Sequence, residues 1–295
     1  FMPKFPGYGV MAQANNTADY TGLALASLIY LYAKNKLNIK WLGLGLALFI
    51  TLLAFTGSRS TYLYLGVLTI LAIGLQIKAI RQQNGSPKIR SLVRTSLILI
   101  PLFLCIQWLL QNTLPDALIN LPSERLEDSM AATTGSARFQ IWFDSWRLAI
   151  QSPWLGIGAG QMRWQSFMLL DSPTPNSFKR VFEHAHNLFL HLFTEMGILA
   201  VLIALVGIIA WMRAFKWREL NLETWWLIAI LAIIGIHSQL EYPLWYAFFL
   251  GILAFLMGAG EEKFTSFTLR KAGRISAVSI LSIVFVVGTV NLGTL

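Results

Sequence analysis

The stretch NLFLHLFTEMGILAVLIALVGIIAW (residues 187–211) decides the fold class of this chain. A helix needs about 20 mostly apolar residues to cross the roughly 30 Å hydrocarbon core of a membrane. This stretch is long enough, and its only titratable side chains are His191 and Glu195. It therefore predicts a membrane-spanning helix.

The rest of the chain has the same character. It is 56% hydrophobic and only 13% charged, with a mean hydropathy of +0.59, whereas soluble domains carry about 25% charged residues. Eight segments are apolar enough to be expected spans: residues 17–33, 41–56, 61–77, 95–110, 187–211, 224–238, 243–257 and 275–291. The sequence thus predicts an all-α polytopic membrane protein with about eight transmembrane helices.

The basic residues predict the orientation of these helices. Fifteen of the 23 Lys and Arg fall in four alternate loops, residues 34–40, 78–94, 213–218 and 263–274. The positive-inside rule makes that side cytoplasmic. The net charge of +9 is then mainly a topology signal, and no nucleic-acid partner is expected. The single cysteine, Cys105, predicts neither a disulfide nor a metal cluster.

This orientation divides the chain into three regions. Residues 1–110 and 187–295 hold transmembrane helices, and residues 111–186 form a large periplasmic loop. Two stretches of the loop, SARFQIWFDSWRLAIQ (136–151) and QMRWQSFMLL (161–170), have apolar residues at helical spacing. We expect them to be short amphipathic helices at the membrane interface, the first capped by Ser136. The run GIGAG (156–160) reads as a turn. Because the chain opens inside what reads as a loop, upstream helices are expected to be missing.

Three of the four histidines gather near the start of the 187–211 span, at positions 184, 186 and 191. A zinc site would need a third ligand beside the HAH pair, and no suitable cysteine or HExxH motif occurs, so no metal is expected. Histidine titrates near neutral pH, which favours His186 as a general base. The alternative is a structural residue at a helix start. For His191 and Glu195 we expect packing roles inside the bundle.

Arginines form the second group of chemical interest on the outer side. Arg59, Arg138 and Arg163 all fall there, and a guanidinium matches phosphate oxygens bidentately. The helix expected to begin near Asn187 adds free N–H groups. Together these groups could hold a diphosphate. The alternative is that the arginines pair with lipid head groups.

Five stretches of the chain carry a family resemblance. They are GVMAQANNTADYTGL (9–23), FTGSRSTYL (55–63), ARFQIWFDSWRLAIQSPWLGIGAGQ (137–161), EHAHNLFLHLFTEMGILA (183–200) and HSQLEYPLWYAFFLGIL (237–253). In this order they resemble the O-antigen ligase and polymerase-like superfamily, and within it the bacterial protein O-oligosaccharyltransferases.

The resemblance implies a multi-pass enzyme of the bacterial inner membrane that works without metal or other cofactor. It would transfer an oligosaccharide from undecaprenyl diphosphate to Ser or Thr hydroxyls of periplasmic or pilin proteins. Membrane lipids would surround the enzyme. Implied catalytic residues are His186, Arg138 and Arg59. Expected substrate-binding residues are His184, Asn187, Tyr242, Glu241, Gln13 and Arg163.

Two other functions stay open from the sequence. Within the superfamily, the chain could be a ligase that joins O-antigen to the lipid A core, or a polymerase that extends the O-antigen. A lipid-linked glycan transporter is the other class, but transporters place their charges near the membrane midplane. Here the charges cluster at one face beneath a large loop, which favours transfer.

Overall fold

A computed structural model describes residues 13–83, 85–115, 121–123, 137–171, 180–219 and 221–261, together with positions 276 and 279. The chain divides into two units, Phe1–Glu261 and Glu262–Leu295. The expected span 275–291 belongs to the second unit and lies outside the described residues, apart from those two helical positions. The expected N-cap Ser136 also lies outside them.

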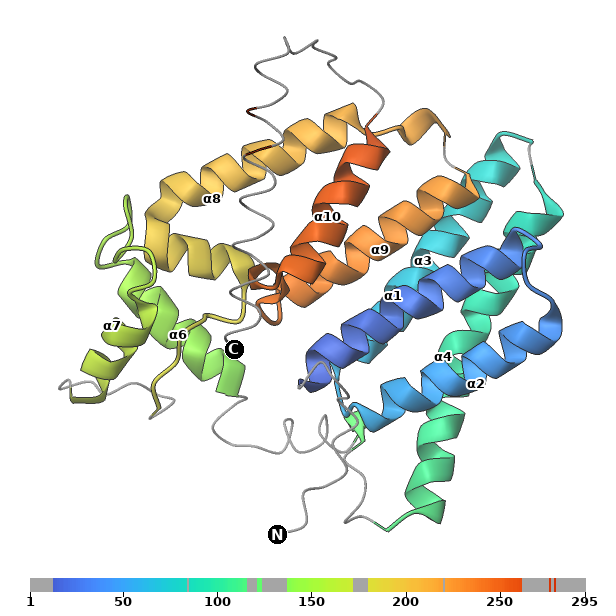
Figure 1. The fold of residues 1–295 in the computed structure, drawn as a ribbon, viewed down its shortest axis with the longest axis horizontal. Helices are drawn as coiled ribbons and strands as arrows, with labels where there is room; N and C mark the ends of the chain where they lie inside the picture. Colours follow the sequence, from blue (N-terminus) through green and yellow to red (C-terminus); the bar gives the residue numbers. More distant parts are fainter. Residues whose placement is uncertain are drawn as a thin grey trace. The chain divides into compact units, whose positions relative to one another are not determined.

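Helices make up the described part of the first unit (Figure 1). They are α1 (Ala14–Ala33), α2 (Ile39–Phe55), α3 (Ser60–Arg81), α4 (Pro87–Thr113), α6 (Ala137–Ala149), α7 (Met162–Met168), α8 (Leu188–Ala214), α9 (Leu222–Ser238) and α10 (Ala247–Gly260), with short 3-10 turns η2 (Leu169–Asp171), η3 (Trp217–Glu219) and η4 (Pro243–Trp245). The all-α class is therefore confirmed for the described residues.

The number of membrane spans is only partly settled. Seven of the eight expected spans fall on helices of the first unit, but among the described residues only α3, α4 and α8 are long and apolar enough to cross a membrane. Helices α2, α9 and α10 are apolar but shorter. The expected start of α10 at residue 243 is wrong, because Pro243 opens the turn η4 and the α-helix begins at Ala247.

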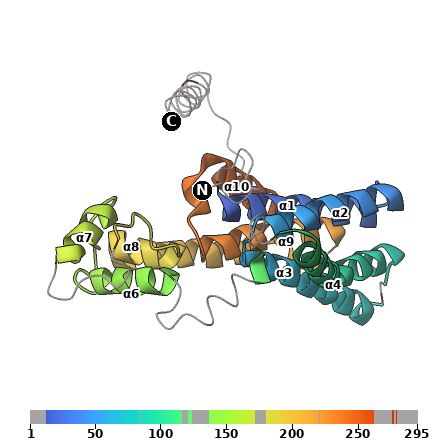
Figure 2. The same ribbon diagram turned by 90° about the horizontal axis from the view of Figure 1, so that it is seen from below.

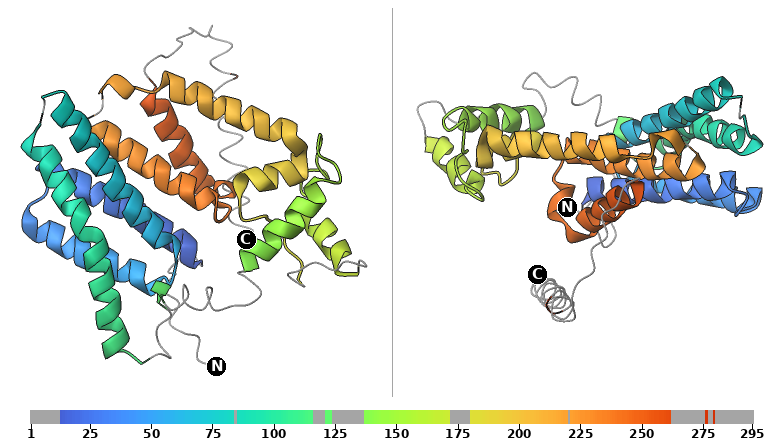
Figure 3. Two further views of the ribbon diagram at one scale, coloured as in Figure 1. Left: turned by 180° about the vertical axis from the view of Figure 1, so that it is seen from behind. Right: turned by 90° about the horizontal axis from the view of Figure 1, so that it is seen from above.

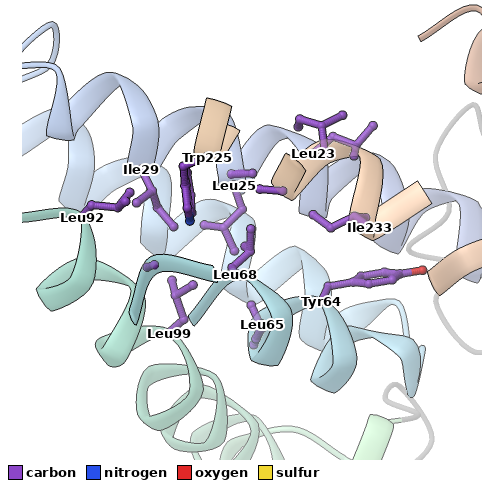
Figure 4. Packing of buried hydrophobic residues seen from close by; sticks show 14 of the residues in the cluster. Leu23, Leu25, Ile29, Tyr64, Leu65, Leu68, Leu92, Leu99, Trp225 and Ile233 are labelled. Atoms are coloured by element: carbon purple, nitrogen blue, oxygen red, sulfur yellow. The ribbon is translucent and has the colours of Figure 1, made fainter. Parts of the chain in front are cut away.

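Five helices, α1, α2, α3, α4 and α9, pack into one bundle (Figure 4). Leu25 and Ile29 of α1, Leu68 of α3 and Ile233 of α9 are fully buried in it. Lipid tails are as apolar as leucine, so close packing of such side chains holds helices together inside a membrane. The bundle gives the polar cluster around Glu241, described below, a rigid base, because α1 begins and α9 ends beside it.

One end of the bundle gathers the basic loops. Lys34, at the end of α1, forms an ion pair with Glu223 at the start of α9. The Nζ of Lys78, near the end of α3, donates to the carbonyl of Trp217 at 2.7 Å. Three of the four basic loops therefore lie together, as the alternating charge predicts. That this end faces the cytoplasm stays a prediction.

Helix α6 packs against α8 (Figure 2), and its two faces differ in burial. The side chains of Asp144 and Ser145 are fully buried, together with most of Ile141. Most of the expected apolar face lies on the exposed side, with Phe139, Phe143, Trp146 and Ile150 exposed, whereas its member Ala149 is buried. An aromatic face turned outward is typical of a helix lying at a membrane interface.

Helix α8 is broken at Gly197, whose φ of 75° lies in the left-handed region (Figure 3). The loop before α7 fills the break with three backbone hydrogen bonds. The amides of Ile157 and Gly158 donate to α8 carbonyls at 2.9 and 3.0 Å, and the amide of Ile198 donates to the carbonyl of Pro153 at 2.8 Å. These bonds satisfy backbone groups that the break would otherwise leave unpaired.

Two glycines make this close approach possible. A Cβ on Gly156 would lie 2.3 Å from the carbonyl carbon of Glu195, and one on Gly197 would lie 2.1 Å from the carbonyl oxygen of Trp154. Any side chain at either position would force the two backbones apart. The expectation that GIGAG forms a turn is confirmed, and its physical reason is this backbone contact.

Candidate functional site

Glu241 is the centre of a polar cluster at the end of the bundle away from Lys34 and Lys78. It follows α9 and is only 5% exposed. Within the described residues, four side chains reach its carboxylate. Arg138 and Asn15 each contact Oε1 at 2.6 Å, while His186 and Gln13 contact Oε2 at 2.7 and 3.3 Å. The cluster therefore joins α1, α6, the start of α8 and the end of α9.

Local structure explains why these groups meet. Gln13 is the N-cap of α1, and Asn15 lies in its first turn. The hydroxyl of Ser58, between α2 and α3, donates to Oδ1 of Asn15 at 2.7 Å, which turns the amide nitrogen toward Glu241. The backbone amide of Glu241 donates to the carbonyl of His237 at 2.8 Å. This bond holds the carboxylate at the end of α9.

The cluster keeps Glu241 ionised. Burial raises the pKa of its carboxyl group, but the hydrogen bond and charge of His186 and the charge of Arg138 outweigh burial and lower the pKa to about 2. A carboxylate with so low a pKa is an anion near neutral pH. An ionised carboxylate can only accept hydrogen bonds, so Nδ1 of His186 donates its proton to Oε2 at 2.7 Å.

The backbone of His186 is strained. Its φ of 50° is one of three positive values for non-glycine residues in the described chain. A non-glycine residue in the left-handed region costs on the order of 1–3 kcal/mol and persists where neighbours fix it, often at functional sites. The next residue, Asn187, caps α8 by accepting the amide of Leu190 at 3.0 Å. The predicted helix start at Asn187 is confirmed.

A stack of aromatic and imidazole rings lies beside the cluster. His184 contacts Tyr242 with ring centroids 4.2 Å apart and Trp245 at 5.4 Å. Burial, followed by the charges of His191 and His186, lowers the pKa of His184 to about 4. Burial also raises the pKa of Tyr242 to about 12. Both side chains are therefore neutral near pH 7.

Two cavities of about 490 Å³ each share the wall formed by Glu183, His184 and Trp245. One is lined by His186, Tyr242 and Tyr246. The other is lined by Arg163, His191 and Glu195. His186 lines the first cavity and does not line the second, so a group that reacts at His186 would sit in the first.

The remaining expected residues lie further from Glu241. Arg163 pairs with Glu183 at 2.7 Å, and both side chains are more than half exposed. Arg59 is the half-buried N-cap of α3, one residue after Ser58. The structure thus brings His186, Arg138, Glu241 and Gln13 into direct contact, with His184 and Tyr242 alongside. Arg59 is linked to them through Ser58 and Asn15.

His191 and Glu195 serve packing, as the sequence indicates. Glu195 accepts the amides of Gly160 and Met162 at 2.9 and 3.1 Å, which ties α8 to the start of α7. His191 Nε2 lies 3.4 Å from the same carboxylate. Within the described residues, no three His, Cys, Asp or Glu side chains are grouped so that they could hold a metal ion.

Sequence reasoning missed a second buried pair. Asp19 of α1 and His237 of α9 lie 2.9 Å apart, and neither side chain is exposed. Asn15 was also missed as a partner of Glu241. The available signal was that Asp19 is the only acid in the expected span 17–33, because an ionisable residue inside a span usually has a partner or a function. Its partner, far along the sequence, could not be read.

Two family models match parts of this chain. Residues 44–205 match the family model described as O-antigen ligase. Residues 225–294 match one described as the C-terminal part of a virulence factor membrane-bound polymerase.

Two relatives come from Acinetobacter baylyi (strain ATCC 33305 / BD413 / ADP1). A general O-oligosaccharyltransferase is 26% identical over 285 residues, which are 95% of this chain and 47% of the relative. A ComP-specific O-oligosaccharyltransferase is 25% identical over 249 residues, which are 84% of this chain and 42% of the relative. The chain therefore spans about half the length of the curated relatives it matches.

Proposed function

Since the chain belongs to the O-antigen ligase family, we propose that it is the catalytic part of a protein O-oligosaccharyltransferase. It moves an oligosaccharide en bloc from undecaprenyl diphosphate to Ser or Thr hydroxyls of periplasmic proteins, pilins among them. The enzyme sits in the bacterial inner membrane with the Glu241 cluster on the periplasmic side. The two similar O-oligosaccharyltransferases support this acceptor class.

The observation that carries the proposal is the 2.7 Å contact between His186 Nδ1 and Glu241. With Nδ1 donating to the carboxylate, we assign Nε2 of His186 as the base, by analogy with carboxylate–histidine pairs in other enzymes. The side chain of His186 is 25% exposed and lines a cavity, so an acceptor hydroxyl can reach it. Glu241 then stabilises the imidazolium that forms.

The reaction is a single displacement at the sugar. His186 Nε2 takes the proton of the acceptor hydroxyl as its oxygen bonds to the anomeric carbon of the glycan. The bond from that carbon to the diphosphate oxygen breaks, and the diphosphate leaves on its lipid. Arg138 uses one guanidinium nitrogen on Glu241, and its other donors, with those of Arg59, are assigned to the charge of the leaving diphosphate.

A second candidate acceptor is a glycan. The match of residues 225–294 to a membrane-bound polymerase favours it, and ligation to the lipid A core belongs to the same chemistry. The same base and arginines would serve either acceptor. The difference lies in what occupies the cavity beside His186.

The test uses the full-length protein in a host that makes a lipid-linked glycan and lacks its own transferases. Mass spectrometry of periplasmic proteins and gel analysis of the lipopolysaccharide are read in parallel. His186→Ala should lower transfer by about 10²–10⁴-fold, the typical contribution of general-base catalysis. Near-normal turnover would overturn the base assignment. A glycan ladder without protein modification would establish the second candidate.

A matched variant separates catalysis from positioning. His186→Gln can still contact Glu241 but cannot take a proton at neutral pH. We expect it to be as inactive as His186→Ala at equal amounts of membrane-inserted protein. Full activity of His186→Gln would make this residue a hydrogen-bonding positioner and leave the reaction without its proposed base.

A further inference from the structure

A groove of about 520 Å³ opens between α2 and α4, at the end of the bundle opposite the Glu241 cluster. Its walls come from one face of each helix. Leu42, Gly43 and Leu46 line it from α2, and Arg90, Arg94 and Ile98 line it from α4. The groove begins where both helices begin, beside the basic loops described above.

Two unpaired cations mark the rim of this groove. Arg90 and Arg94 are spaced by four on α4, so they extend from the same face one turn apart. Both are exposed. In the described part of the chain neither forms an ion pair or a side-chain hydrogen bond, and no Asp or Glu lines the groove. Two guanidinium groups without a counter-charge form a site for an anion.

The floor of the groove is apolar. Leu42 and Leu46 form its buried base, and the exposed Ile98 lines the end farthest from Pro87 along α4. Gly43 leaves open space, since a Cβ built there has no atom within 4 Å. From Pro87 to Ile98 the groove follows α4 for roughly 16 Å, about half the thickness of the hydrocarbon core.

We propose that this groove binds one anionic glycerophospholipid of the cytoplasmic leaflet, of the phosphatidylglycerol type. Its phosphate lies between Arg90 and Arg94, and an acyl chain follows Leu42 and Leu46 past Gly43. The sequence of surfaces along the groove matches this lipid, because the charged surface lies at the aqueous end and the apolar surface lies toward the membrane centre. An acidic peptide or free phosphate would use the arginines and leave the apolar floor uncovered.

The leaflet follows from the charge distribution. Lys34 and Lys78 lie at the same end of the bundle as the groove, and basic residues mark the cytoplasmic side. Basic pockets between spans on that side recognise anionic head groups. This inference rests on the orientation of the helices and is independent of the reaction assigned to His186.

The test is native mass spectrometry of the full-length protein released from nanodiscs that contain either phosphatidylglycerol or phosphatidylcholine. The wild type should retain phosphatidylglycerol and lose phosphatidylcholine. The Arg90→Gln/Arg94→Gln variant should bind phosphatidylglycerol roughly 30-fold more weakly, because each basic side chain near an anionic lipid contributes about a factor of five. Gly43→Leu, which fills the groove and keeps both charges, should also lose the lipid.

The matched control removes two charges from the same end outside the groove. Lys36→Gln/Lys40→Gln should retain phosphatidylglycerol like the wild type, since neither lysine lines the groove. Equal loss in both double variants would show nonspecific attraction and overturn the site. Equal retention of both lipids by the wild type would also overturn the lipid site. So would a wild-type protein that retains neither lipid because another part of the chain fills the groove.

Discussion

Replacing Glu241 with glutamine keeps the shape of the side chain and removes the charge that four donors share. The pKa of this carboxyl falls from 4.5 to about 2 in the folded protein. Each unit corresponds to about 1.36 kcal/mol, so the ionised form stabilises the fold by about 3 kcal/mol at neutral pH. Glu241→Gln should therefore lower the free energy of unfolding by this amount and nearly abolish glycan transfer, because His186 loses its orienting anion.

The dependence on pH has a definite sign. The folded state holds its proton less tightly than the unfolded state, so the stabilisation is complete above pH 4.5 and disappears as the pH falls from 4.5 toward 2. The difference in stability between wild type and Glu241→Gln should be largest near neutral pH and shrink below about pH 4.5. Unfolding of the full-length protein in detergent, followed by intrinsic fluorescence, measures it.

Glu223→Gln supplies the matched control. It makes the same chemical change at the other end of the bundle, where Glu223 is half exposed and pairs with Lys34. Exposed ion pairs contribute about 0–1 kcal/mol, so this variant should keep both stability and transfer. A Glu241→Gln protein with wild-type stability and activity would refute the assignment of Glu241 as the centre of the site.

Three further outcomes follow from the geometry. Asp19→Asn or His237→Gln alone leaves one partner of a fully buried pair uncompensated and should cost about 3–5 kcal/mol; the double variant should cost less than the sum, and additive losses in unfolding measurements would refute the pairing. Gly197→Ala should destabilise the folded protein through its contact with Trp154, whereas Gly207→Ala in the same helix, which has open space, should not; equal melting temperatures would contradict the backbone contact. Wild-type stability should fall as the pH drops from 6.5 toward 4, because folding disfavours the charged form of His184; a His184→Phe protein with the same pH slope would show that another group is responsible.

The sequence predicted what depends on local pattern. Runs of apolar residues gave the helices close to their observed bounds, as for residues 61–77 against α3 (Ser60–Arg81). Helical spacing gave α6, and a polar residue before an apolar run gave the start of α8 near Asn187. These features are decided by neighbours a few residues apart, which one sequence displays.

The site depends on contacts that the sequence does not display. Glu241 meets Gln13 and Asn15 across more than 220 residues and Arg138 across 103. The pairing of Asp19 with His237 has the same character. The resemblance placed His186, Arg138 and Glu241 in one site, but only packing of α1 against α9 shows that the carboxylate organises the other groups.

Because of the break in α8, this segment has one conformation in the folded protein and can have another during membrane insertion. During synthesis, Leu188–Ala214 is one apolar stretch that can enter the bilayer as an unbroken helix. After folding, only residues 198–214 continue past Gly197, and they cover roughly 26 Å, close to the thickness of the hydrocarbon core. The first ten residues are then free to tilt toward the loop that pairs with them. We therefore expect the site to form in a late folding step, in which residues 188–197 leave the line of the span and bond to the loop before α7.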